Sequence, residues 1–165
     1  GIEIANHLTE QNIIPDQLIC CTGGGGLIAG ISIGIHQHFP DLDIIAAEPD
    51  GFDDFKRSLE LGERVSNDPD ARSICDAIIT AMPGEMTFAI NQAHVKSAAV
   101  VSDDEALMAV ATAWRYLKCV AEPGGAVALA AILSGKVEAR NKTSIVIVSG
   151  GNIDQAMFTR ALNML

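Results

Sequence analysis

The sequence predicts an α/β fold with a mostly parallel sheet. Short apolar runs of strand length alternate with longer segments that are apolar at helical spacing. Residues 17–47 have the pattern of a strand, a glycine loop, a helix and a second strand, which is one βαβ unit with parallel strands. Helices should therefore cover the faces of the sheet, and a ligand should bind beyond the carboxyl ends of its strands.

The individual elements follow from periodicity and from the positions of glycine and proline. Ser102 and Glu105 form a capping box at the start of one helix. The stretch from Gly51 to Pro83 is polar, contains a turn at residues 67–70, and carries the weakest pattern of the chain. Helices are expected at residues 2–11, 27–39, 86–95, 103–120, 125–133 and 154–165, and strands at 17–21, 43–47, 98–101 and 144–148.

The composition is that of one globular domain, with 165 residues of which 48% are hydrophobic and 19% charged. No apolar run approaches the roughly 20 residues of a membrane span, and the start lacks the pattern of a signal peptide, so we expect a cytoplasmic protein. The net charge of −10 disfavours nucleic acid and anionic membranes as partners. The first residue is Gly1, and the segment through His7 has the pattern of a helix inside a domain, which suggests a piece of a longer protein.

The cysteines and histidines do not predict a zinc site. Cys20 and Cys21 are neighbours in a predicted strand, so their side chains should point to opposite faces. The four cysteines form neither a C-x-x-C pair nor a disulfide framework, and we expect buried thiols. His36 and His38 are two residues apart and do not share a helix face.

Four consecutive glycines, Gly23, Gly24, Gly25 and Gly26, stand where the first strand ends and a helix begins. Glycine has no side chain to hold a ligand away, so successive amide groups can converge on a phosphate. The following helix adds unpaired N–H donors and the positive end of its dipole. A turn that only packs a helix against a strand would explain one or two glycines, so the run predicts an anion site.

Two further glycine-rich clusters fall where loops should meet the same edge of the sheet. They are residues 122–126, Glu-Pro-Gly-Gly-Ala, and residues 149–152, Ser-Gly-Gly-Asn. Alone, a Ser-Gly-Gly-Asn segment after a strand is usually a turn. Three such strand ends together indicate a crevice in which the backbone lies close to a flat or phosphorylated ligand.

A dinucleotide site is the rival hypothesis. Gly24, Gly26 and Ala29 satisfy the pattern G-x-G-x-x-G/A, and Glu48 ends the next strand, where an acid that binds a ribose would lie. A dinucleotide turn tolerates side chains between its glycines, whereas all of residues 23–26 are glycine. The uninterrupted run fits a terminal phosphate better.

In their order and spacing these motifs resemble the fold type II pyridoxal phosphate enzymes, and among them the threonine/serine dehydratase (ammonia-lyase) and serine racemase group. The resemblance extends over nearly the whole chain and includes the segments Ala47-Glu48-Pro49 and Ile153-Asp154. It implies a three-layer sandwich of the tryptophan synthase β-subunit type. It also implies that residues 1–165 are the C-terminal, cofactor-phosphate-binding part of a catalytic domain.

The resemblance implies pyridoxal 5′-phosphate as the cofactor and a hydroxy-amino acid, threonine or serine, as the substrate. The family reaction removes the Cα proton, expels the β-hydroxyl as water, and releases a 2-oxo acid and ammonia. A neutral serine hydroxyl at the pyridine nitrogen suits this β-elimination, because it leaves the ring a weaker electron sink than a carboxylate would. The implied cofactor-binding residues are Gly23, Gly24, Gly25, Gly26 and Leu27 for the phosphate, Ser149 for the pyridine nitrogen, and Glu122 near the ring.

The sequence departs from the family pattern in one respect, since it has no Schiff-base lysine. The family carries this lysine upstream in a Ser-Phe-Lys-like setting, and the lysines of this chain lie in polar or helical, surface-like contexts. We therefore expect no catalytic residue here and an inactive chain when it stands alone. The lysines are Lys56, Lys96, Lys118, Lys136 and Lys142.

A divalent cation, Mg²⁺ or another, is also implied through the serine racemase-like members. Glu48, the backbone carbonyl of Phe52, and Asp54 match the family's ligand spacing, and hard cations prefer such oxygen ligands. The alternative is that Glu48 caps a loop and that the aspartates are solvated.

The resemblance further implies a homodimer or homotetramer. Within the enzyme class, a serine racemase or a 3-hydroxyaspartate ammonia-lyase stays open. Outside it, the alternative is a non-catalytic module that binds a phosphate-bearing ligand or a dinucleotide.

Overall fold

The computed structural model describes all residues from 1 to 165, and at its centre lies a four-stranded parallel sheet. The strand order is β3-β2-β1-β4, so the two strands of the predicted βαβ unit occupy the middle. Apolar runs of strand length form these strands because helices bury both of their faces. The strands are β1 (Gln17–Cys21), β2 (Asp43–Pro49), β3 (Ser97–Val101) and β4 (Ser144–Val146).

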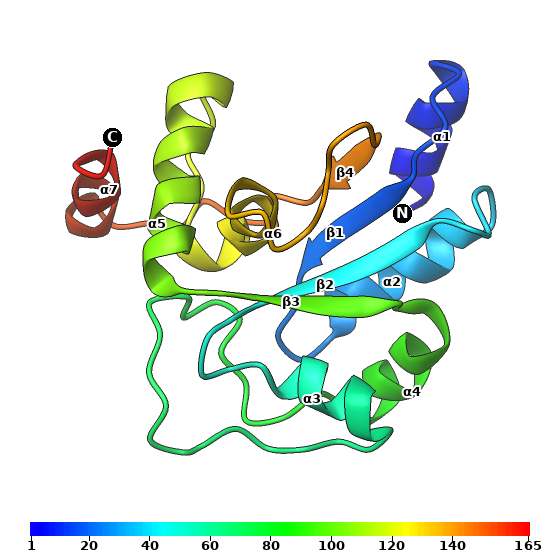
Figure 1. The fold of residues 1–165 in the computed structure, drawn as a ribbon, viewed down its shortest axis with the longest axis horizontal. Helices are drawn as coiled ribbons and strands as arrows, with labels where there is room; N and C mark the ends of the chain where they lie inside the picture. Colours follow the sequence, from blue (N-terminus) through cyan, green and yellow to red (C-terminus); the bar gives the residue numbers. More distant parts are fainter.

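Helices cover both faces of the sheet, which makes the predicted three layers (Figure 1). One face carries α1 (Ile2–Glu10), α2 (Gly26–His36), α3 (Asp54–Leu61) and α4 (Glu85–His94). The other face carries α5 (Asp103–Thr112), α6 (Pro123–Leu133) and α7 (Gln155–Leu162). None of these helices is long and apolar enough to cross a membrane.

Two cores follow from the alternation of side chains along each strand. Leu18 and Cys20 of β1 point into the core beneath α2, where Phe55 and Phe88 meet edge to face. Ile19 and Cys21 point into the larger core beneath α5 and α6. The vicinal cysteines thus lie on opposite faces, as predicted, and neither forms a disulfide.

The predicted helix 103–120 is too long. Its start is confirmed, since the Ser102 Oγ accepts from the Glu105 amide at 3.2 Å and the Glu105 carboxylate accepts from the Ser102 amide at 2.7 Å. The α-helix ends at Thr112, and a π-helical turn, Ala113–Leu117, follows it. Trp114 packs edge-on against Phe158 of α7 with ring centroids 5.7 Å apart, so a tertiary contact overrides the helical pattern.

Other differences are smaller. The polar stretch between Gly51 and Pro83 contains α3, a helix that the pattern did not indicate. The strand predicted at 43–47 continues to Pro49, and the last strand is two residues shorter than predicted, at 144–146. The helix predicted at 27–39 ends at His36.

Candidate functional site

The glycine loop lies at the carboxyl end of β1 and leads into α2. The backbone N–H groups of residues 23–28 donate no hydrogen bond within the chain. Gly25, the N-cap of α2, has φ +85°, a left-handed conformation that favours glycine. Consecutive unpaired amides at a helix N-terminus form an anion-binding cradle.

The four glycines meet different surroundings. A Cβ atom on Gly23 would lie 2.6 Å from the carbonyl oxygen of Ile78, and one on Gly25 would lie 2.7 Å from Nδ2 of Asn91. At Gly24 the nearest atom would be 3.9 Å away, and at Gly26 no atom lies within 4 Å. Close packing thus requires two of the glycines, while the other two border open space.

This open space is part of a cavity of about 260 Å³ in front of the loop. No charged side chain and no lysine lines it, so only backbone amides and the helix dipole can bind an anion there. The lining residues are Cys21, Thr22, Gly23, Gly24, Gly25, Gly26, Leu27, Ile28, Ala77, Ile78, Thr80 and Ser149.

Ser149 reaches this cavity because β4 runs parallel to β1 with Ile19 opposite Val146. The amide of Ile147 donates to the carbonyl of Ile19 at 3.0 Å and extends the pairing beyond the strand. The Cys21 thiol then donates to the Ser149 hydroxyl at 2.9 Å. The structure therefore brings Ser149 and the glycine loop, two predicted site residues from distant parts of the sequence, to one cavity.

Glu122 lies next to this cavity but does not line it. Its carboxylate lies against Gly150, where an added Cβ would be 1.9 Å from the Glu122 Oε1. A Cβ on Gly125 would be 2.7 Å from the backbone of Gly150. The glycines of the second and third clusters thus let the N-terminus of α6 approach the loop that carries Ser149.

Sequence reasoning missed the residues that hold the glycine loop from α4. Thr87 donates its hydroxyl proton to the carbonyl of Gly24, and the Asn91 side-chain amide donates to the carbonyl of Gly25 at 3.1 Å. The amide of Gly84 also donates to the Gly24 carbonyl, at 3.1 Å. The only local signal is that Thr87 and Asn91 are four residues apart and so share a helix face.

Glu48 and Asp54 are both buried at the start of α3. The two carboxylate oxygens of Glu48 accept hydrogen bonds from the amides of Phe55 and Lys56, each at 2.9 Å. Oδ2 of Asp54 is buried and has no partner, and the carbonyl of Phe52 accepts no backbone hydrogen bond. No group of three or more His, Cys, Asp or Glu side chains could hold a metal ion, so a cation here would also need the carbonyl and water.

The pKa values of both carboxyl groups are raised. Burial raises the pKa of Glu48 to about 8 against the two amide hydrogen bonds, and the charges of Asp54 and Asp53 add to the shift. Burial also raises the pKa of Asp54, while its hydrogen bond from Asn67 acts the other way. Two adjacent buried carboxyls with raised pKa values would be stabilised by a cation.

The dinucleotide hypothesis loses its acidic residue. Glu48 is fully buried, and both of its carboxylate oxygens are hydrogen-bonded to α3. It therefore cannot reach a ribose in the cavity beyond the glycine loop.

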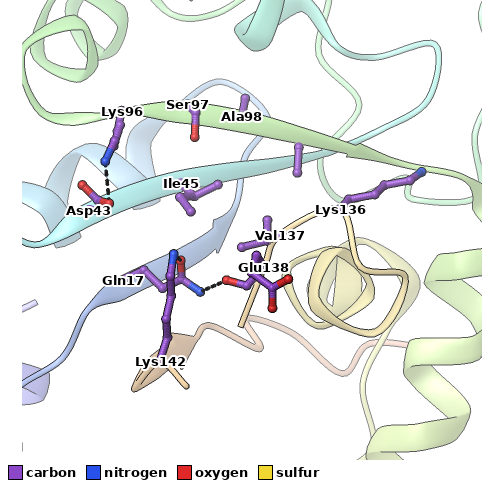
Figure 2. A pocket seen from close by; sticks show the side chains of 11 residues that line it. Gln17, Asp43, Ile45, Lys96, Ser97, Ala98, Lys136, Val137, Glu138 and Lys142 are labelled. Carbon is purple, nitrogen blue, oxygen red and sulfur yellow. Dashed lines mark hydrogen bonds and ion pairs between the residues drawn. The ribbon is translucent and has the colours of Figure 1, made fainter. Parts of the chain in front are cut away.

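A second cavity, of about 250 Å³, lies at the opposite, amino-terminal end of the strands (Figure 2). Its polar groups are already paired. Lys96 contacts Asp43 at 2.6 Å, and the side-chain amide of Gln17 donates to the carbonyl of Glu138 at 2.9 Å. Lys136, which points away from these groups in Figure 2, contacts Glu105 at 2.6 Å. This end of the sheet offers no unpaired group for a ligand.

Comparison with known families identifies the class of protein. Residues 1–151 match the family of pyridoxal-phosphate dependent enzymes, so the chain belongs to that family. The glycine cradle, the uncharged cavity and the hydroxyl of Ser149 fit a phosphorylated pyridine.

The relatives include racemases and lyases. The chain is 37% identical over 162 residues to a serine racemase of Dictyostelium discoideum, covering 95% of this chain and 49% of the relative. It is 32% identical over 165 residues to an L-threonine ammonia-lyase of Thermotoga maritima, covering 99% of this chain and 39% of the relative. A β-hydroxyaspartate dehydratase of Paracoccus denitrificans is 33% identical over 150 residues, which cover 91% of this chain and 47% of the relative. The chain thus spans at most about half the length of these curated relatives.

Solved structures confirm the fold. A threonine deaminase of the organism abbreviated T.th. superposes with a TM-score of 0.85 at 33% identity, covering 92% of this chain and 54% of that one. A maize serine racemase gives 0.83 at 32% identity, covering 98% of this chain and 51% of that one. The predicted α/β sandwich of the fold type II enzymes is confirmed.

Proposed function

We propose that this chain is the C-terminal, cofactor-phosphate-binding part of an ammonia-lyase that acts on threonine or serine. The full-length protein would eliminate water from the hydroxy-amino acid and release a 2-oxo acid and ammonia. One observation carries the proposal: the unpaired amides of residues 23–28 and the hydroxyl of Ser149 border the same uncharged cavity.

The glycine loop would bind the phosphate of the cofactor. Gly24 and Gly26 leave room for the phosphate, and the amides of residues 23–27 supply its hydrogen bonds. Since no lysine or arginine lines the cavity, the amides and the dipole of α2 would neutralise the phosphate charge alone.

Ser149 would bind the pyridine nitrogen. Its oxygen accepts the Cys21 thiol proton, so its own hydroxyl proton remains free to be donated into the cavity. When bound, pyridoxal phosphate supplies the electron sink that stabilises negative charge at the substrate Cα. A neutral hydroxyl keeps that sink weak, which favours departure of the β-hydroxyl over more extensive delocalisation.

The lysine that would hold the cofactor covalently must come from outside these residues. None of the lysines of this chain lines the cavity. The proposal therefore places that lysine, together with the contacts to the substrate carboxylate, in a preceding part of the protein.

We also propose a divalent cation at Glu48, the carbonyl of Phe52, and Asp54. The unpartnered Oδ2 of Asp54 and the unused carbonyl of Phe52 support this site. The cation would neutralise buried carboxylates at the N-terminus of α3 and so stabilise the β2–α3 connection.

A serine racemase is the second candidate, and the 37% identity to the Dictyostelium discoideum racemase favours it. A 3-hydroxyaspartate ammonia-lyase is a third activity within the same chemistry. We further propose a cytoplasmic homodimer or homotetramer. The exposed apolar side chains of Tyr116 and Leu117 after α5 support a contact with another part of the protein or with a second copy.

The test uses the full-length gene product supplied with pyridoxal phosphate. Visible absorption of lysine-bound cofactor, together with 2-oxobutanoate from threonine or pyruvate from serine, is the expected result. Formation of D-serine without pyruvate would instead assign the racemase, and oxaloacetate from 3-hydroxyaspartate would assign the third activity. A full-length product that binds no pyridoxal phosphate would overturn the proposal and leave a module for another phosphate-bearing ligand.

A further inference from the structure

Asn67 lies between the proposed cation site and the cofactor cavity. Its side-chain Nδ2 donates one hydrogen bond to Oδ1 of Asp54 and a second, of 2.8 Å, to the carbonyl of Thr80. Its backbone amide donates to the carbonyl of Ala81 at 2.9 Å. One residue of a polar loop thus joins a buried carboxylate of α3 to the segment that borders the cavity.

Arg57 fixes the orientation of this amide. Its guanidinium donates to Oδ1 of Asn67, to the carbonyl of Ser66 at 3.1 Å, and to Oδ1 of Asp53 at 3.0 Å. Because the Asn67 oxygen faces Arg57, its NH₂ group must face Asp54 and Thr80. A side chain held at three points transmits a displacement of Asp54 better than a freely rotating one.

The segment beyond Thr80 reaches the glycine loop directly. Thr80 lines the cavity, and Ile78 lies in close contact with Gly23. Gly84 donates its amide to the carbonyl of Gly24 at 3.1 Å. The path from Asp54 to the phosphate cradle therefore consists of Asn67, the segment 78–84, and Gly24.

We propose that Asn67 is a positioning residue that couples cation binding at Glu48 and Asp54 to phosphate binding by the glycine loop. The inference rests on the proposed function. Without a cation, two buried carboxylates face each other, and the position of Asp54 is set by hydrogen bonds alone. A cation bound to its free oxygen would fix Asp54, and through Asn67 it would fix the segment that holds Gly24.

The experiment measures the dissociation constant of pyridoxal phosphate for the full-length protein with and without saturating Mg²⁺. In the wild type, Mg²⁺ should tighten cofactor binding by about fivefold or more, the lower end of typical couplings between sites. In Asn67→Ala this ratio should fall to about one, while both ligands still bind. Asn163→Ala is the matched control, because Asn163 is exposed at the end of α7 and should leave the ratio unchanged.

Linkage supplies a second readout that needs no activity. The cofactor must tighten Mg²⁺ binding by the same factor, and Asn67→Ala must abolish that effect as well. If Asn67→Ala does not fold, amide hydrogen exchange in the wild type replaces it, and Mg²⁺ should slow exchange at Gly84.

The outcomes separate this inference from the proposed function. An unchanged ratio in Asn67→Ala, or unchanged exchange at Gly84 with Mg²⁺ bound, would overturn the coupling and leave the enzyme proposal intact. Mg²⁺ that fails to bind would overturn both the cation site and the coupling. A protein that binds no pyridoxal phosphate would overturn the proposed function itself.

Discussion

Gly25 is subject to two constraints, a left-handed backbone and contact with Asn91. Gly25→Ala should lose about 1 kcal/mol from backbone strain and should also weaken pyridoxal phosphate binding about tenfold, because the new Cβ would push against Asn91. Gly62→Ala is the matched control, since Gly62 has φ +77° and open space around it. Urea unfolding and cofactor titration check both variants. Equal cofactor affinities would contradict a role of the loop in phosphate binding.

Ser149 is the residue on which the proposed electronic tuning depends. Ser149→Ala should lower kcat of the full-length enzyme about tenfold, the effect of one lost hydrogen bond, while phosphate binding by the glycine loop persists. Steady-state kinetics with threonine or serine measure this change. Ser134→Ala, at an exposed helix end outside the cavity, is the control. An unchanged kcat would remove Ser149 from the site.

Glu48 gives the protein a predicted dependence on pH. Its folded-state pKa of about 8 lies above the ordinary value of 4.5, so the folded protein binds more protons than the unfolded chain between these values. Without a cation, the free energy of unfolding should therefore fall as pH rises from about 4.5 to about 8. Glu48→Gln should reduce this slope in urea unfolding at a series of pH values. An identical slope in the variant would contradict the assignment.

At the scale of elements, α4 acts as a support for the glycine loop. Asn91 is fully buried, and its amide holds the carbonyl of Gly25. Asn91→Ala should cost about 1–3 kcal/mol of stability, because the Gly25 carbonyl would lose its partner, and should weaken cofactor binding severalfold. Gln92→Ala, on an exposed position of the same helix, should change neither by more than about 0.5 kcal/mol. Chemical denaturation and cofactor titration measure both effects.

The π-helical turn after α5 shows where element prediction failed. Residues 113–117 continue the apolar helical pattern without glycine or proline, yet Lys118 adopts φ +56° and the chain turns away. Packing of Trp114 on Phe158 involves residues more than forty positions apart. No local pattern can report such a contact, so only the boundary, and not the existence of the helix, was wrong.

At the scale of the whole molecule, the chain has both faces of its sheet covered but lacks a lysine in its cavity. We expect the 165-residue chain alone to fold, to bind the cofactor weakly, and to produce no 2-oxo acid. Circular dichroism and a 2-oxo acid assay check this, with the full-length protein as the positive control. Turnover by the chain alone would show that the catalytic groups lie within it.

The sequence by itself determined the alternating architecture, the glycine cradle, and the pairing of the cradle with Ser149 in one family pattern. These features are local, because runs of glycine, capping residues and apolar periods act over a few positions. Tertiary structure alone decided which glycines face open space, since that depends on Ile78 and Asn91 from distant segments. It also decided that Glu48 is buried against α3, and that Asn67 of a polar loop connects Asp54 with the cavity. Such contacts join residues that only chain folding brings together.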